Sequence, residues 1–194
     1  MTLRALGGVA IARLYVQRRV LLYACAAAFV VGILQPEGAA GPVVFCSLLG
    51  IAMALSQSPG RHPHLDRCEQ GAPLFGRELA RAKGLVPYFG ASLAALSYAS
   101  AQTVRGSHDA AFDLLIALAA VAASTSTALC ASIRRGWSRI LYILLAFTAG
   151  TMTYALAVTA HALLAGFAFA ALATFLALRQ YGEALARYDP VEDL

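Results

Sequence analysis

The sequence is poor in charge and lacks the short motifs of several common enzyme classes. Only 13% of its 194 residues are charged, whereas an average soluble domain has about 25%. It contains no GxxxxGK[ST] phosphate-binding loop, no GxSxG and no HExxH. The paired aspartates expected of a membrane lipid transferase are also missing. We therefore predict that the chain is not an enzyme and that any ATP-driven work needs a separate ATPase.

Cysteines and other metal-ligand residues are few and scattered. The four cysteines form no CxxC pair, so neither a disulfide framework nor a zinc ribbon is expected, and we interpret them as small buried side chains. Ligand types that suit zinc or copper do gather at His62, His64, Asp66 and Cys68. Because Pro63 lies in the same polar stretch, a linker is the favoured interpretation, and no metal or other cofactor is predicted.

What the sequence has in abundance is long apolar runs. It is 60% hydrophobic, with a mean hydropathy of +0.68, and about 20 apolar residues suffice to cross a hydrocarbon layer of about 30 Å. We predict an all-α polytopic membrane protein with one domain over residues 1–194 and six spans, at 20–34, 42–56, 85–103, 110–133, 138–157 and 160–178. The apolar spacing from Leu3 to Gln17, interrupted by Arg4 and Arg13, predicts an amphipathic interfacial helix before the first span.

The basic residues predict the orientation of these spans. If the amino terminus, the 57–84 loop, the Arg134 turn and the carboxyl tail share one side, only Arg105 of the 15 Lys and Arg residues falls on the other. Since basic residues concentrate on the cytoplasmic side, both termini are predicted to be cytoplasmic. The net charge of +5 is then a sign of topology and gives no reason to expect nucleic-acid binding.

The long polar loop at 57–84 carries the strongest functional signal. Pro73 to Lys83 is predicted to form a short amphipathic helix, with proline in its first turn and Gly84 just past its end. Such a helix can dock into a groove on a cytoplasmic partner. Alternatively, it lies on the lipid headgroups, with its basic side chains touching anionic lipid.

The loop contains the stretch Arg67-Cys68-Glu69-Gln70-Gly71 followed by Pro73-Leu74-Phe75-Gly76-Arg77-Glu78-Leu79-Ala80-Arg81-Ala82-Lys83. It has an acidic residue and a glycine, and then a proline, a basic residue, an acidic residue and a lysine. This order resembles the segment between spans two and three of type 2 permeases of ATP-binding-cassette (ABC) transporters. The six-span layout, the amphipathic first segment and the cytoplasmic termini are also similar to the family.

The resemblance implies a membrane subunit of an ABC exporter in a bacterial cytoplasmic (inner) membrane. Its partners would be an ABC ATPase subunit, a second permease subunit (identical or homologous) and membrane lipids. The loop would contain a coupling helix that sits in a cleft of the ATPase, with contact residues Glu69, Pro73, Leu74, Phe75, Arg77, Glu78 and Arg81.

Polar residues inside the spans are the remaining candidates. A substrate path is a hypothesis for Ser124, Thr127, Thr151 and Tyr154, although hydroxyls in membrane helices also bond their own backbone or a neighbouring helix. If the helix of Asp113 begins early, Arg105, Asp109 and Asp113 share one face at i, i+4 spacing, and pairing with the arginine could offset the cost of burying a carboxylate.

Two other functions stay open at this stage. One is a structural or assembly subunit of a larger membrane complex, packed through alanine-rich helices. The other is a membrane enzyme or redox subunit that uses the histidines.

Overall fold

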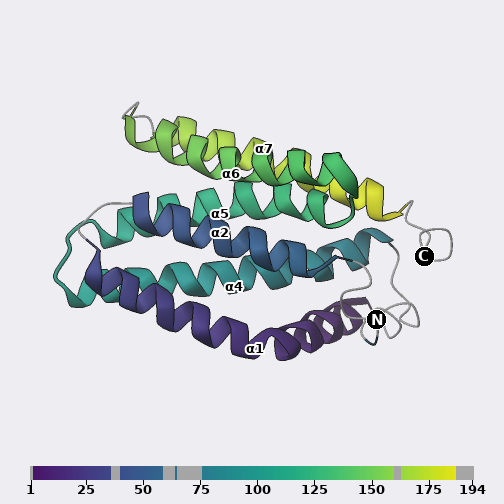
Figure 1. Cartoon of the computed structure of the whole chain (residues 1–194), viewed down its shortest axis with the longest axis horizontal. Helices are drawn as coiled ribbons and strands as arrows, with labels where there is room; N and C mark the ends of the chain where they lie inside the picture. The colour runs from purple at the N-terminus through teal and green to yellow at the C-terminus, as the bar shows by residue number, and fades with distance from the viewer. Residues whose placement is uncertain (1, 36–39, 59–63, 65–75, 160–162, 187–194) are drawn as a thin grey trace.

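The computed structural model describes residues 2–35, 40–58, 64, 76–159 and 163–186. These residues form six long α-helices and no strand (Figure 1), which confirms the predicted all-α class. The helices are α1 (Thr2–Leu34), α2 (Ala40–Ser56), α4 (Gly76–Val104), α5 (Ala110–Ser132), α6 (Gly136–Thr159) and α7 (Leu163–Ala186).

Four of the helices are long and apolar enough to cross a membrane, over Gly7–Leu34, Ala110–Ser132, Gly136–Val158 and Leu163–Ala184. The apolar helix α2 is shorter, at 17 residues. Helix α4 has 29 residues but begins with the charged sequence GRELARAK and contains Pro87. The chain is therefore consistent with an integral membrane protein.

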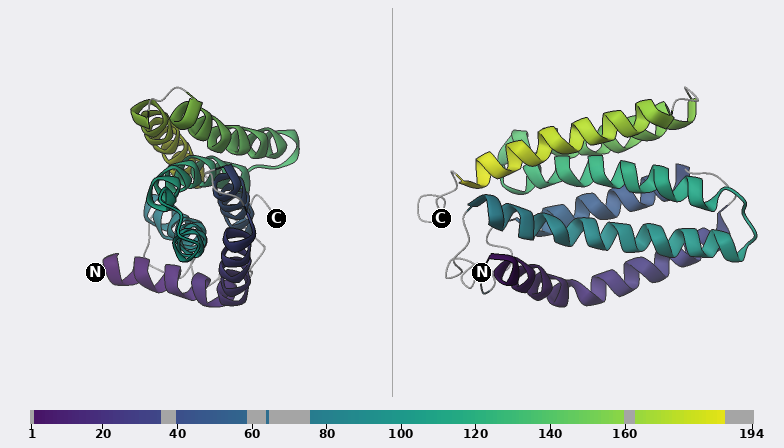
Figure 2. Two further views of the ribbon diagram at one scale, coloured as in Figure 1. Left: turned by 90° about the vertical axis from the view of Figure 1, so that its left-hand side faces the viewer. Right: turned by 180° about the vertical axis from the view of Figure 1, so that it is seen from behind.

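The helices run alternately up and down one long axis, so that α1, α4 and α6 begin at the same end (Figures 1 and 2). We call this the basic end, because Arg13, Lys83, Arg134, Arg135, Arg139 and Arg179 all lie in the halves of the helices, or in the turn, nearest to it, and Arg18 and Arg19 lie at the middle of α1. Arg105 lies at the opposite end, after α4. Helices α1, α4 and α6 therefore begin at the end where most of the described basic residues lie.

Two helices continue where the sequence predicted a boundary. The expected interfacial segment and the first span form one helix, α1, whose amino-terminal part is bent across the long axis of the bundle (Figure 2). The predicted helix end at Gly84 is wrong, because α4 continues from Gly76 to Val104. Gly84 lies inside this helix, and a Cβ atom there would make only an ordinary van der Waals contact with Leu129, at 3.5 Å.

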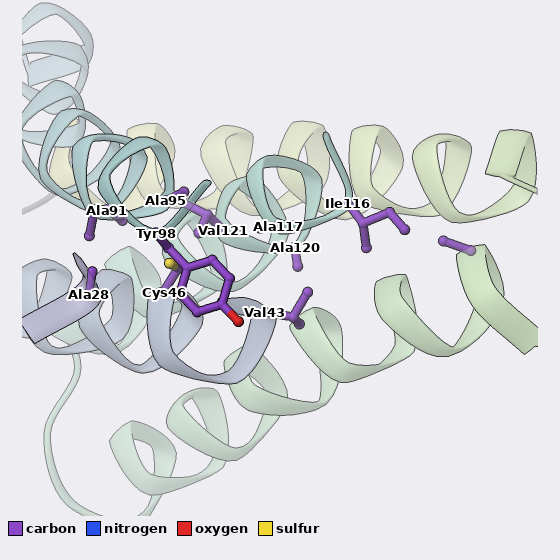
Figure 3. Packing of buried hydrophobic residues seen from close by; sticks show 12 residues of the cluster. Ala28, Val43, Cys46, Ala91, Ala95, Tyr98, Ile116, Ala117, Ala120 and Val121 are labelled. Carbon is purple, nitrogen blue, oxygen red and sulfur yellow. The ribbon is translucent and has the colours of Figure 1, made fainter. Parts of the chain in front are cut away.

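Helix α5 forms the centre of the bundle. It contacts α2, α4, α6 and α7, and 67% of its most apolar stretch is buried, against 17% for α7. The largest core cluster joins α5 to α1, α2, α4 and α6, and it includes Tyr98, Cys46 and Ile116 (Figure 3). Small residues dominate this core, as expected where membrane helices approach closely.

Glycines allow the closest of these approaches. A Cβ atom on Gly32 of α1 would lie 2.9 Å from the carbonyl oxygen of Tyr98 and 2.8 Å from Cβ of Ala101, both on α4. A Cβ on Gly50 of α2 would lie 2.3 Å from Oγ1 of Thr125 on α5. The helices could not keep these separations with any larger residue at Gly32 or Gly50.

The outer surface of the bundle is apolar. Large hydrophobic side chains are exposed along several helices, among them Leu22, Leu34, Leu144, Leu164 and Phe175. Water-soluble monomers rarely expose contiguous apolar patches of more than a few hundred Å². In a hydrocarbon environment these apolar side chains are not exposed to water. The backbone polar groups of the helices form their hydrogen bonds within each helix, so they need no water either.

We predict that Gly32→Ala lowers the free energy of unfolding by about 1–3 kcal/mol, because the added methyl group overlaps the backbone of α4. The matched control is Gly8→Ala in the same helix, where nothing lies within 4 Å of the added Cβ. Unfolding of both variants in mixed detergent micelles measures the difference. Equal stability of the two variants would contradict the close α1–α4 contact.

Candidate functional site: a polar network at the basic end

Apolar contacts hold the amino-terminal part of α1 against the basic end. Ala10 packs with Met53 of α2 and Val86 of α4, and Leu14 lies against the same cluster. This small cluster fixes the face of α1 that turns toward the bundle. The next polar residues on that face are Arg13 and Gln17, which are separated by about one helical turn.

Arg13 and Gln17 form hydrogen bonds with Ser56, the last residue of α2, and with Gln57, which directly follows it. Arg13 is only 1% exposed, and its Nη1 donates to Oε1 of Gln57 at 2.9 Å. Gln17 donates from Nε2 to Oγ of Ser56 at 2.5 Å. Gln57 in turn donates from Nε2 to the carbonyl oxygen of Met53 at 3.3 Å. We call these four residues, Arg13, Gln17, Ser56 and Gln57, the basic-end network.

The start of α4 lies beside this network in the fold. Lys83 is 5% exposed, although lysine is almost never fully buried unless it is paired. Glu78 is half-buried in the first turn of α4, where the helix dipole favours a carboxylate. Arg13, Glu78 and Lys83 all take part in further polar or electrostatic contacts. Buried charges at this end are therefore partnered, as their desolvation cost requires.

Of the seven predicted ATPase-contact residues, three lie in the first turns of α4: Arg77, Glu78 and Arg81. The other four, Glu69, Pro73, Leu74 and Phe75, lie outside the described residues. The charged stretch from Gly76 to Lys83 adds about 12 Å of helix before the apolar part of α4 begins. The predicted coupling segment is thus partly a direct extension of a long helix.

The hydroxyl residues proposed for a substrate path are bonded to their own helices. Ser124 is fully buried and donates to the carbonyl of Val121 at 3.3 Å. Thr127 donates to the carbonyl of Ala123 at 2.8 Å, and Thr151 to that of Phe147 at 3.1 Å. Tyr154 packs against the largest core cluster. A path along these four residues stays a prediction.

A small apolar recess lies elsewhere, between α5, α6 and α7. Ile116, Thr153, Gly166 and Phe167 are among its lining residues. The recess has no enclosed space for even a water molecule, whereas small-molecule sites in proteins have volumes of about 300–1,000 Å³. It is therefore not a substrate cavity.

The opposite end of the bundle holds a second polar group. Asp113 is 7% exposed near the start of α5. Because α5 begins only at Ala110, after the positive φ of 85° at Gly106, Arg105 does not share a helix with Asp113. Arg105 instead donates from Nη1 to the carbonyl oxygen of Gln35. The condition for the predicted i, i+4 pairing is therefore not met.

The described residues contain no group of three or more His, Cys, Asp and Glu side chains that could hold a metal ion. His62, Asp66 and Cys68 of the sequence cluster lie outside them. Among the described cysteines, Cys25, Cys46 and Cys130 are free thiols.

Comparison with protein-family models, curated proteins and solved structures finds no match for this chain. The function therefore has to be inferred from the arrangement of its own residues.

We predict that Arg13 and Gln57 are energetically coupled by about 1–3 kcal/mol. Removing either side chain leaves the other as a buried polar group without its hydrogen-bond partner. A double-mutant cycle with Arg13→Ala and Gln57→Ala measures this coupling as a difference in unfolding free energy. Strictly additive effects would show that their hydrogen bond does not hold α1 against α2.

Proposed function

We propose that the chain is the membrane (permease) subunit of an ATP-driven ABC transporter that exports its substrate. It works with a separate ABC ATPase subunit and a second permease subunit, in the cytoplasmic (inner) membrane of a bacterium. The observation that carries the proposal is the charged beginning of α4, a helix of 29 residues that starts at the basic end. The resemblance of the loop from Glu69 to Lys83 to ABC permeases supports an ABC ATPase as the partner.

Three further features support this role. The helix order and directions agree with a six-span permease whose ends share one side. The bent amino-terminal part of α1 agrees with an interfacial helix. The basic-end network joins this part to the end of α2, directly before the 57–84 loop. A partner that moves the loop would therefore also pull on α1 and α4.

The mechanism follows from that connection. ATP binding closes two ATPase subunits and moves the coupling segments of two permease subunits together. Because Gly76–Val104 is one helix, displacement of its charged start tilts the part inside the membrane. The interface between the two permease subunits then opens alternately to each side, and substrate moves outward.

A non-catalytic structural or assembly subunit is the second candidate. The dense packing of small residues around α5 favours it, because the recess between α5, α6 and α7 has no enclosed space for a substrate. The two functions differ in their partners. A stable native complex without any ATPase would select the structural role.

We predict that Glu78→Lys lowers capture of the ATPase subunit by at least about tenfold, because it reverses the charge at the proposed contact. The matched control is Glu183→Lys, near the same end, where the native carboxylate pairs with Arg179 at 3.0 Å on the exposed surface of α7. Co-purification in mild detergent from cells that contain the native partner measures capture. Thermal unfolding confirms that each variant is folded.

Equal capture by Glu78→Lys, Glu183→Lys and the native chain would contradict the coupling role of α4. Equal loss with both variants would point to general charge attraction at the basic end, and the assignment of Glu78 would be wrong.

A further inference from the structure

The middle of α1 carries two arginines on the outside of the bundle. Arg18 and Arg19 are both exposed. Arg13 and Gln17 precede them in the sequence and are buried against the bundle. The bent amino-terminal part of α1 leads up to the exposed pair, and the uncharged stretch from Val20 to Leu34 follows along the bundle (Figure 2). The basic-end network does not include the exposed arginines, so they need a separate explanation.

Two exposed tyrosines lie on the same face of α1 as these arginines. Tyr15, Arg19 and Tyr23 follow one another at a spacing of four residues, which places them along one side of the helix. Tyr15 is 61% exposed and Tyr23 is 75% exposed. The guanidinium carbon of Arg18 lies 4.0 Å from the centre of the Tyr15 ring, and this contact holds Arg18 on the outer surface. We call these four residues the α1 aromatic–basic patch.

The charge of the patch is not neutralised within the described part of the chain. Helix α1 contains no acidic residue. Neither Arg18 nor Arg19 forms an ion pair or a side-chain hydrogen bond with a described residue. In this they differ from Arg13, Lys83 and Arg135, which all take part in further contacts. Two exposed guanidinium groups are thus available to an anion that comes from outside the chain.

The patch lies at a depth that suits lipid headgroups. From Arg19 to the end of α1 at Leu34, the helix rises about 22 Å, whereas a hydrocarbon layer is about 30 Å thick. Arginine side chains whose backbone lies just inside the hydrocarbon extend their charged groups to its edge. Tyrosine favours the same level, because its ring is apolar and its hydroxyl is polar. The guanidinium groups therefore reach the level of the lipid phosphates.

Apolar side chains continue from the patch along the outer surface of α1. Leu22, one turn after Arg18, is 70% exposed. Farther along the helix, Val30 is 52% exposed and Ile33 is 42% exposed. An anion with hydrocarbon chains would contact both the arginines and these side chains, whereas a soluble anion would contact the arginines alone. The combination favours a phospholipid over a soluble anion.

We infer that the α1 aromatic–basic patch binds the headgroup of an anionic phospholipid. Arg18 and Arg19 bind the phosphate, whose oxygens suit the planar guanidinium fork. Tyr15 keeps Arg18 on the outer surface, and Leu22 contacts an acyl chain. This inference rests on the bundle lying in a bilayer and does not depend on the permease role.

A tryptophan introduced beside the patch reports which lipid is bound. Leu22→Trp is made in a chain whose single native tryptophan is replaced by Trp137→Phe. The protein is reconstituted in bilayers that mix phosphatidylglycerol and phosphatidylcholine, with brominated acyl chains on one lipid at a time. Bromine quenches tryptophan emission only on contact, so the two quenching curves give the relative affinity of the lipids. We expect a preference of at least about fivefold for phosphatidylglycerol, because its net negative charge attracts basic residues at the membrane surface.

Substitutions in the patch separate a local site from general charge. Arg18→Gln combined with Arg19→Gln should bring the preference to about one. The matched control is Arg139→Gln, near the same end on α6, which should leave the preference unchanged. Tyr15→Ala should lower the preference by at least about twofold, because Arg18 loses the ring that holds it. Thermal unfolding shows whether each variant is folded, and Arg19→Gln alone, which should at least about halve the preference, replaces a double variant that does not fold.

Equal quenching by the two lipids, with both arginines present, would overturn the inference. A loss with Arg139→Gln as large as that of the double variant would also overturn it, because the preference would then come from the charge of the whole basic end. Millimolar inorganic phosphate should not change the quenching, and if it releases the anionic lipid, the assignment to phospholipid is wrong. Quenching by neither lipid would show that this face of α1 does not lie in a bilayer, which would contradict the membrane setting itself.

Discussion

The close approach of helices around α5 is the contact on which the other features depend. In a bilayer, hydrocarbon tails are as apolar as leucine, so helices associate through tight packing and hydrogen bonds. The glycines at positions 32 and 50 let α1 meet α4 and let α2 meet α5 at separations that no larger residue allows. Small side chains thus occupy the interior, and the large apolar side chains are left to face lipid.

This packing also explains why charge gathers at the ends. In a core of alanine, glycine and serine, a buried arginine is stable only where other polar groups form hydrogen bonds with it, as Gln57 does with Arg13. The bend of α1 brings Arg13 close to Gln57. Helix α4 is long enough for the acidic and basic residues at its start to lie beyond its apolar part. The polar network and the charged start of α4 therefore share the basic end.

The sequence predicts the all-α class and the helix directions, because long apolar runs and one-sided arginines are strong local signals. It does not predict that α1 and α4 continue past their expected boundaries, since Gly84 is also the residue type that ends helices. It also misses the basic-end network. Arg13 looks like an interfacial charge in sequence, and only the folded position of α2 places Gln57 within hydrogen-bond distance.

The account depends most on the bundle crossing a bilayer with its basic end in the cytoplasm. In a chain whose native cysteines are replaced, single cysteines at the exposed positions 105 and 135 test this directly. A membrane-impermeant maleimide applied to intact cells should label Arg105→Cys, and it should label Arg135→Cys only after the membrane is opened. Labelling of both positions in intact cells, or of neither before opening, would contradict the account.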